Sequence, residues 1–275
     1  MIFSVIGGDE RMIYLGELLK SGGHTVRMCG FEKHKSHIPC VSVGDAIFGA
    51  HCVVLPVPTS KDGKSVFTPL GANEILLKDL VSAADRKTVF FSAGTRLGAA
   101  QEYNYLAREE FSLLNAVPTA EGAIAKAIES TNHTLWRSRC LVIGYGRIGK
   151  VLCERLRAFG ANVTTTYRRA ETKSLIEMSG YDGIDSCALC ESLLKYDIIF
   201  NTVPAAMLSE HELLKVKKDC IIIELASAPY GVDAACAEKC GIRVITASGL
   251  PAKTAPVTAA EIIHRTINNI LNEHF

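Results

Sequence analysis

The sequence predicts an α/β protein built from two Rossmann-like lobes with parallel sheets and an interdomain cleft. Short β-branched runs alternate with amphipathic helical segments, and the alternation is completed twice along the chain. Strands separated by helices are joined by right-handed crossovers, which make neighbouring strands parallel. A chain of 275 residues has room for two such domains.

The first lobe is expected over residues 1–117. Its strands are apolar runs without helical periodicity, and its helices place apolar residues three and four positions apart. The predicted strands are Met1–Gly7, His24–Cys29, Cys52–Pro56, Thr88–Ser92 and Ser112–Val117, and the predicted helices are Arg11–Lys20, Asn73–Ala83 and Leu97–Arg108. Gly22-Gly23 ends the first helix, since glycine favours the position after a helix C-terminus.

The second lobe is expected over residues 118–257. Thr119 is predicted to cap a helix over Ala120–Ser130, with Glu121 in its first turn. The predicted strands are Arg139–Gly144, Ala161–Tyr167, Asp197–Thr202, Cys220–Leu225 and Arg243–Ala247, with a helix at Arg147–Phe159. A last helix, Thr258–Leu271, follows a proline-spaced loop, and residues 258–275 are expected to pack back on the first lobe.

Composition argues against several classes of partner. The net charge of +1 removes the long-range attraction expected of a protein that binds nucleic acid or an anionic membrane. No apolar run reaches the roughly 20 residues that span a bilayer. Met1–Gly8 reads as a buried strand and a tight turn, without the basic start and cleavage site of a signal peptide. We therefore expect a cytoplasmic protein.

The ten cysteines are expected to be reduced, because a cytoplasmic chain of this length needs no disulfides. Two groups have spacings known from metal sites: Cys187-x-x-Cys190, and the set Cys29, His34, His37 and Cys40. The first lacks a second cysteine pair, and the second lies in a charged stretch without catalytic residues nearby. We interpret both as ordinary side chains and expect no metal.

Gly144-Tyr-Gly146-Arg-Ile-Gly149 is the strongest motif of the chain. It follows the apolar strand Cys140–Ile143 and opens a helix, the context that a dinucleotide-binding GxGxxG motif requires. The first glycine permits the tight turn, the second lets the diphosphate approach the backbone, and the third lets helix and strand pack. The helix N-terminus then offers free N–H groups to the phosphates.

The next strand selects the dinucleotide. An NAD site places Asp or Glu about 20 residues after the turn, on the ribose 2′-hydroxyl. Here the strand ends without an acid and runs into Arg168-Arg169, which either solvate the strand end or hold a 2′-phosphate. We predict NADP(H). The predicted cofactor-binding residues are Gly144, Tyr145, Gly146, Arg147, Ile148, Thr166, Tyr167, Arg168, Arg169, Thr202, Val203, Pro204, Ala226, Ser227 and Leu250.

Several motifs together resemble the A subunits of dipicolinate synthase. They are Ile6-Gly-Gly-Asp-Glu-Arg11, Pro118-Thr-Ala-Glu-Gly122, Gly144-Tyr-Gly-Arg-Ile-Gly149, Asn201-Thr-Val-Pro204, Leu225-Ala-Ser-Ala-Pro229 with Gly231 and Asp233, and Gly249-Leu-Pro251 followed by Ala255-Pro256 and Thr258-Ala259. The resemblance implies NADP-dependent oxidation of a dihydro- or hydroxytetrahydro-dipicolinate to pyridine-2,6-dicarboxylate for the spore core. It also implies a partner, a flavoprotein-like B subunit, and a place in the mother cell of a sporulating bacterium. A homo-oligomer is expected.

The wider relatives include D-2-hydroxyacid dehydrogenases, which place a catalytic histidine after proline before the final helix. This chain has Val257 at that place, which counts against alcohol–ketone chemistry. The alternatives that stay open are a dehydrogenase of another small carboxylate and a non-catalytic protein that binds NADP within a heteromeric enzyme.

The remaining site predictions come from strand ends and helix starts, where ligands of parallel sheets bind. For the cyclic dicarboxylate substrate they are Thr59, Ser60, Ser92, Gly94, Arg96 and Thr119; the predicted catalytic residues are Glu121, Ser227 and Lys253. Glu121 is the candidate proton acceptor, although a first-turn glutamate also serves the helix dipole. Arg96 and Lys253 either pair with substrate carboxylates or are simply solvated. Asp9 and Arg11 either line the cleft floor or form a helix-cap pair.

Overall fold

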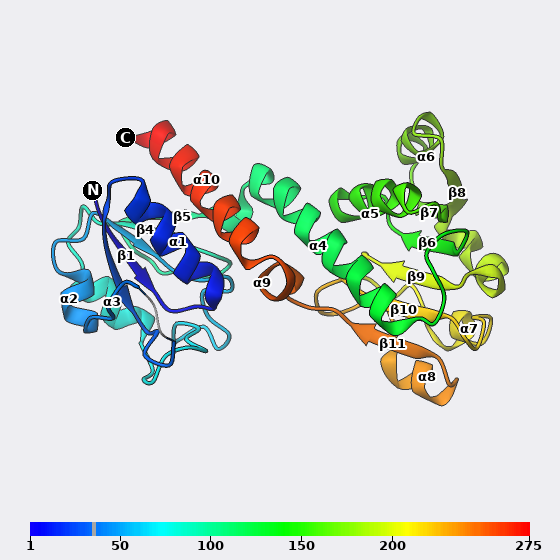
Figure 1. Ribbon diagram of the computed structural model, residues 1–275, viewed down its shortest axis with the longest axis horizontal. Helices are drawn as coiled ribbons and strands as arrows, with labels where there is room; N and C mark the ends of the chain where they lie inside the picture. The colour runs from blue at the N-terminus through cyan, green and yellow to red at the C-terminus, as the bar shows by residue number, and fades with distance from the viewer. Residues whose placement is uncertain (35–36) are drawn as a thin grey trace. The chain divides into compact units, whose positions relative to one another are not determined.

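A computed structural model describes residues 1–34 and 37–275 (Figure 1). The chain forms two compact units, one of Met1–Asn115 with Ala255–Phe275 and one of Ala116–Thr254. Each unit contains one parallel sheet. Within the described ranges, no helix combines the length and apolar character that crossing a membrane requires.

The first unit has a five-stranded sheet in the order β2-β1-β3-β4-β5. Its strands are β1 (Ile2–Ile6), β2 (Thr25–Cys29), β3 (Cys52–Val54), β4 (Val89–Ser92) and β5 (Gln101–Asn104), and its helices are α1 (Glu10–Ser21), α2 (Val43–Ile47), α3 (Leu77–Ala83), η1 (Tyr105–Ala107) and α10 (Pro256–His274). This is the second common doubly wound strand order. The parallel pairing is continuous across the sheet.

Both faces of this sheet are covered, because its side chains alternate between two apolar clusters. Phe3 and Val5 of β1 belong to the cluster under α1 and α10, whereas Ile6 joins the cluster under α2 and α3. Helix α10 lies against α1 (Figure 1). Its buried residues Ile263, Ile267 and Ile270 recur at helical spacing and form the stripe that faces the sheet.

The second unit has a six-stranded sheet in the order β11-β10-β9-β6-β7-β8. Its strands are β6 (Arg139–Ile143), β7 (Asn162–Tyr167), β8 (Asp182–Asp185), β9 (Ile198–Asn201), β10 (Ile221–Glu224) and β11 (Arg243–Thr246), and its helices are α5 (Arg147–Ala158), α6 (Ala170–Met178), η2 (Ser186–Lys195), α7 (Glu210–Leu213), α8 (Ala234–Lys239) and α9 (Leu250–Thr254). This is the Rossmann order, whose switch point lies between β6 and β9, where dinucleotides bind.

Helix α4 (Glu109–Ser130) corrects the prediction for the segment around Pro118. The expected strand Ser112–Val117 and the expected helix start at Thr119 are wrong, because one helix runs through the whole stretch. Pro118 costs the hydrogen bond to the carbonyl four residues earlier but does not end the helix. Ala120, Ala123 and Ala127 of this helix pack in the core of the second unit, and this burial outweighs the proline.

The expected helix over Leu97–Arg108 is also wrong. Its centre forms the edge strand β5, which pairs in parallel with β4 through Phe91 and Tyr103. Alanine, leucine and glutamate favour a helix locally, but an open sheet edge offers the segment a complete ladder of hydrogen bonds. Tertiary pairing therefore overrides local propensity here.

Candidate functional site

The turn between β6 and α5 is shaped by two of its three motif glycines. Gly144 has φ +95°, and a Cβ there would lie 2.7 Å from Thr202 Oγ1. A Cβ on Gly149 would lie 2.0 Å from the carbonyl oxygen of Gly144. Glycine at both positions lets the turn, the helix and the end of β9 come into contact, as the motif predicts.

Gly146 plays a different part, because nothing lies within 4 Å of where its Cβ would be. It is the N-cap residue of α5 and provides no side-chain cap, and the first turn of this helix contains no acidic residue. The first N–H groups of α5 therefore keep their hydrogen-bonding capacity and the positive end of the helix dipole. An anion can approach them without displacing a protein group.

A cavity of about 360 Å³ opens beside this turn. Its walls are the glycine turn, the end of β7 and the segments that follow β8 and β9. The lining residues are Gly144, Tyr145, Gly146, Thr166, Tyr167, Arg168, Arg169, Thr172, Ser186, Val203 and Met207. Thr166 joins two of these walls, since its hydroxyl accepts a hydrogen bond from the Gly144 N–H at 2.9 Å.

The charge of this cavity is positive. Among the described residues, none of those lining it is Asp or Glu. Arg168 and Arg169 are exposed, and within the described chain their guanidinium groups have no hydrogen-bond or ion-pair partner. Asp185, which pairs with Tyr167 across β7 and β8, turns its carboxylate to the Cys187 N–H at 2.9 Å and caps η2.

A buried carboxylate that the sequence motifs did not indicate organises the ends of β9 and β10. Glu224 is 2% exposed and accepts hydrogen bonds from the Asn201 side-chain amide at 2.9 and 3.0 Å. It also accepts backbone N–H groups from Ala226, Gly231 and Val232 at 2.9–3.0 Å. A buried carboxylate with this many donors fixes its loop. A single acid at the end of an otherwise apolar strand, Ile-Ile-Ile-Glu, was the available signal.

The other predicted residues of the second unit are not among those that line the cavity. Thr202 donates its hydroxyl to the Ile143 carbonyl oxygen at 2.8 Å, and Pro204 and Ser227 are exposed. Leu250 is 2% exposed and packs in the apolar core, where a Cβ added to Gly122 would lie 3.0 Å from it. Lys253 is exposed at the end of α9. Arg147 and Ile148 form the first turn of α5, and Ala226 is buried.

Glu121 and Thr119 lie in the middle of α4, not at a helix start. The Glu121 carboxylate is more than half exposed and lies 3.5 Å from Arg155 Nε of α5. Thr119 is 9% exposed. The dipole role considered for Glu121 therefore falls away, while its carboxylate stays accessible.

In the first unit, the predicted substrate hydroxyls are engaged inside the protein. Thr59 Oγ1 accepts the Ala93 N–H at 2.7 Å, so the loops after β3 and β4 are joined directly. Ser92 donates to Glu102 at 3.1 Å, and Glu102 also accepts the backbone N–H of Leu97.

The exposed members of this set lie further along the same loops. Ser60 bonds Asp62, which gathers the N–H groups of Lys64 and Ser65. Gly94 is exposed, with φ +84°. Arg96 is exposed, and its guanidinium has no partner among residues 1–34 and 37–275.

Asp9 and Arg11 form a cap pair at the start of α1. The Asp9 carboxylate accepts the Arg11 N–H at 3.2 Å and pairs with the guanidinium at 2.8 Å. Arg11 also donates to the Val57 carbonyl oxygen at 2.6 Å, which ties the β3 loop to this helix start.

Comparison with known proteins gives consistent relatives over the whole chain. Residues 2–104 match the model of the N-terminal domain of the dipicolinate synthase A subunit, whereas residues 113–250 match the NAD binding domain of D-isomer specific 2-hydroxyacid dehydrogenases. The chain is 30% identical over 284 residues to the A subunit of dipicolinate synthase from Bacillus subtilis (strain 168), covering 98% of this chain and 95% of the relative.

Two solved structures share the fold over nearly their full length. The A subunit of dipicolinate synthase from Bacillus halodurans matches with a TM-score of 0.90 and 24% identity, over 98% of this chain and 97% of that one. The corresponding chain of dipicolinate synthase from Bacillus subtilis matches with a TM-score of 0.88 and 28% identity, over 99% and 96%.

Proposed function

The chain belongs to the family of dipicolinate synthase A subunits, and from that premise we propose that it dehydrogenates dihydrodipicolinate, or its hydroxytetrahydro precursor, to pyridine-2,6-dicarboxylate with NADP. Membership confirms the resemblance seen in the motifs. It makes the protein an oxidoreductase with a nicotinamide-cofactor domain of the hydroxyacid dehydrogenase type. The single observation that carries the choice of NADP is the carboxylate-free cavity with Arg168 and Arg169 at its rim.

The residues around this cavity fit a dinucleotide. The open position at Gly146 and the uncapped N-terminus of α5 suit a diphosphate, which needs N–H donors and a close approach to the backbone. When bound, the nicotinamide ring accepts a hydride. Arg168 and Arg169 can each give a charge-assisted hydrogen bond worth about 1.5–3 kcal/mol to the 2′-phosphate. Solvent screening reduces this at an exposed site, and a preference of about a hundredfold for NADP over NAD follows.

The chemistry asked of the protein is modest. A dihydropyridine dicarboxylate loses one hydride to NADP and one proton to a base, and the ring becomes aromatic. Positioning therefore contributes more than strong acid–base assistance. We assign proton acceptance to Glu121, whose exposed carboxylate makes only a loose contact of 3.5 Å with Arg155. Ser227 and Lys253 are the other proposed catalytic residues, as a hydroxyl at a strand end and as an exposed cation.

Recognition of the substrate dianion is assigned in the first unit to Arg96. Its guanidinium is exposed on the loop after β4 without a protein partner in the described part of the chain. Glu102 holds that loop by accepting the N–H groups of Leu97 and Gly98. A planar guanidinium on a fixed loop can bind a carboxylate through two parallel hydrogen bonds.

The relatives carry the name of one lettered component of their synthase, which indicates an enzyme of more than one kind of polypeptide. We propose that the partner of this chain is a flavoprotein-like B subunit, and that the two act in the mother cell of a sporulating bacterium. The test follows NADPH formation from freshly generated dihydrodipicolinate, using the purified chain with and without the B subunit. We expect NADPH from NADP⁺, and much slower formation of NADH from NAD⁺ at equal concentration.

A second candidate, a non-catalytic NADP-binding component, is favoured by Val257 at the place of the hydroxyacid dehydrogenase histidine. The same assay separates the two. NADPH formed by the chain alone, and lost in Glu121→Gln, supports the dehydrogenase. Binding of NADPH without turnover, alone or with the B subunit, would contradict it and leave the second candidate.

A further inference from the structure

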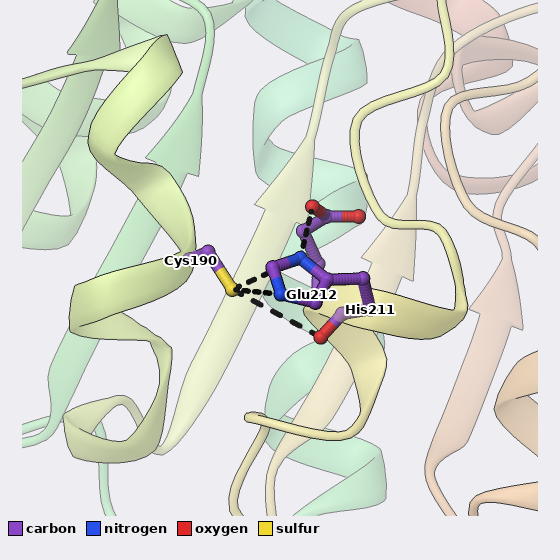
Figure 2. Close-up of side chains that lie close together, drawn as sticks. All are labelled: Cys190, His211 and Glu212. Carbon is purple, nitrogen blue, oxygen red and sulfur yellow. Dashed lines mark hydrogen bonds and ion pairs between the residues drawn. The ribbon is translucent and has the colours of Figure 1, made fainter.

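Three side chains with different metal-binding atoms meet between η2 and α7 of the second unit (Figure 2). Cys190 Sγ lies 3.5 Å from His211 Nδ1 and 4.0 Å from His211 Nε2. His211 Nδ1 lies 3.2 Å from Glu212 Oε1. The three ligand atoms lie within 4.8 Å of one another, and none of these residues lines the cofactor cavity.

The protons present do not explain this convergence. Both the thiol sulfur and the carboxylate approach the same ring nitrogen, His211 Nδ1. If Nδ1 carries the proton, it donates to Glu212 and cannot accept from the thiol; if it does not, it accepts from the thiol and its lone pair faces the carboxylate. A nucleophilic triad is also excluded by this geometry, since the two partners would then lie on opposite ring nitrogens.

We propose that Cys190, His211 and Glu212 bind one Zn²⁺ ion, with the fourth position open to water. Zinc prefers thiolate, imidazole and carboxylate ligands in tetrahedral geometry. Its bond lengths of about 2.3, 2.0–2.1 and 2.0–2.2 Å make the S–N edge of the tetrahedron about 3.6 Å and the N–O edge about 3.4 Å. The separations of 3.5 and 3.2 Å are close to these edges.

Glu212 is held in the orientation that such a site needs. Its second oxygen, Oε2, accepts the Ser209 N–H at 3.0 Å and the Ser209 hydroxyl, in the capping box of α7. This leaves Oε1 directed at His211 (Figure 2). Burial acts against ionisation, but the hydrogen bonds from Ser209 and His211 lower the pKa of Glu212 below its ordinary value. Such outer contacts orient metal ligands.

The ion would tie together two segments that form walls of the cofactor cavity. Helix η2 begins at Ser186, whose hydroxyl donates to the Tyr167 carbonyl oxygen at 2.9 Å, and Met207 precedes α7. Ser186 and Met207 both line that cavity. The metal assignment itself does not depend on the proposed reaction, because its readouts are metal affinity and ligand identity.

The test uses the full chain, stripped with a chelator and kept in a thiol-free reductant. Zn²⁺ is titrated in competition with a chromophoric chelator, and Co²⁺ replaces it for absorption spectroscopy. We expect one equivalent of metal and a thiolate-to-cobalt charge-transfer band. Cys190→Ser and His211→Gln should each weaken binding about a hundredfold or more, and Cys190→Ser should abolish the band. Glu212→Gln, which retains a capping-box residue, should weaken binding as well.

Two cysteine variants serve as matched controls. Cys187→Ser changes an exposed thiol on the same helix that lies outside the ligand set, and Cys40→Ser changes an exposed thiol of the first unit. Both should bind metal as the unchanged chain does. The alternative set Cys29, His34, His37 and Cys40 flanks residues 35 and 36, which lie outside the described residues. Absence of metal binding, a cobalt complex without the thiolate band, or loss of the metal in either control would overturn the proposal.

Discussion

The two units contain the same local construction, a parallel strand, a glycine turn and a helix, and they use it in opposite ways. At the start of α1, Asp9 caps the helix and binds Arg11, and Glu10 adds a second acid to the first turn. At the start of α5, Gly146 provides no side-chain cap and no acid follows. The positive end of α1 is thus neutralised by the protein, whereas that of α5 is kept for an anion.

The space around the two turns differs in the same sense. A Cβ on Gly8 would lie 2.5 Å from Met12 and 2.7 Å from Pro56, so protein atoms already surround that turn. A Cβ on Gly146 would meet nothing within 4 Å. Strand and helix periodicity are alike in the two units, and the difference between a structural turn and a binding turn lies in two or three residues at the helix start.

The largest expected effect comes from Gly149→Ala, because its Cβ would lie 2.0 Å from the backbone oxygen of Gly144. Backbone must move, and we expect a loss of about 3 kcal/mol in the free energy of unfolding. Trp136 is the single tryptophan of the chain and belongs to the second unit, so its fluorescence follows the unfolding of that unit in urea. An unchanged midpoint would show that the turn has room at this position.

The double variant Arg168→Ala/Arg169→Ala tests the ligand that the turn of the second unit serves. We expect NADPH affinity to fall about a hundredfold, or roughly 2.7 kcal/mol, with little change in NADH affinity. Isothermal titration at low and high salt measures both, and the loss should shrink as salt rises. Arg155→Ala removes an arginine of α5 that lies outside the cavity lining and serves as the matched control. Equal losses for the two dinucleotides would contradict recognition of the 2′-phosphate.

How much of this the sequence could predict depends on how local the cause is. The strand–turn–helix of the second unit follows from its glycine spacing and apolar runs, and the structure has it at β6 and α5. The edge strand β5 and the unbroken α4 depend on a sheet edge and a core that no local pattern contains. Of the site, the glycine turn and the two arginines were visible as motifs, because their function depends on spacing.

Glu224 and the Cys190, His211 and Glu212 cluster were not visible for a related reason. The donors to Glu224 come from Asn201 and from a loop up to eight residues later, so only the folded ends of β9 and β10 show what the acid does. Cys190 was noticed for its spacing to Cys187, but its contacts are with His211, 21 residues away. Pairings across elements are set by the strand order, which local sequence does not encode.

Asp9→Ala tests the turn of the first unit and should cost about 2 kcal/mol of stability. About half comes from the lost helix cap. The rest comes from Arg11, which is 10% exposed and would lose its carboxylate partner, discounted because Asp9 is 26% exposed. Urea unfolding followed by circular dichroism measures the loss, and NADPH affinity should stay unchanged. Asp9→Asn keeps a capping side chain and should cost less. A drop in NADPH affinity would mean that this turn also serves the cofactor.

Gly146→Ala gives the smallest effect and the sharpest contrast with Gly149→Ala in the same turn. The added methyl meets no protein atom, and the backbone of Gly146 has φ −87°, which alanine adopts freely. We therefore expect unfolding midpoints within error of the unchanged chain. The methyl occupies the space that a diphosphate needs, so NADPH affinity should fall about tenfold, or roughly 1.4 kcal/mol. A stability loss with affinity retained would reverse the roles assigned to the two glycines, and the open space at Gly146 would then be unrelated to binding.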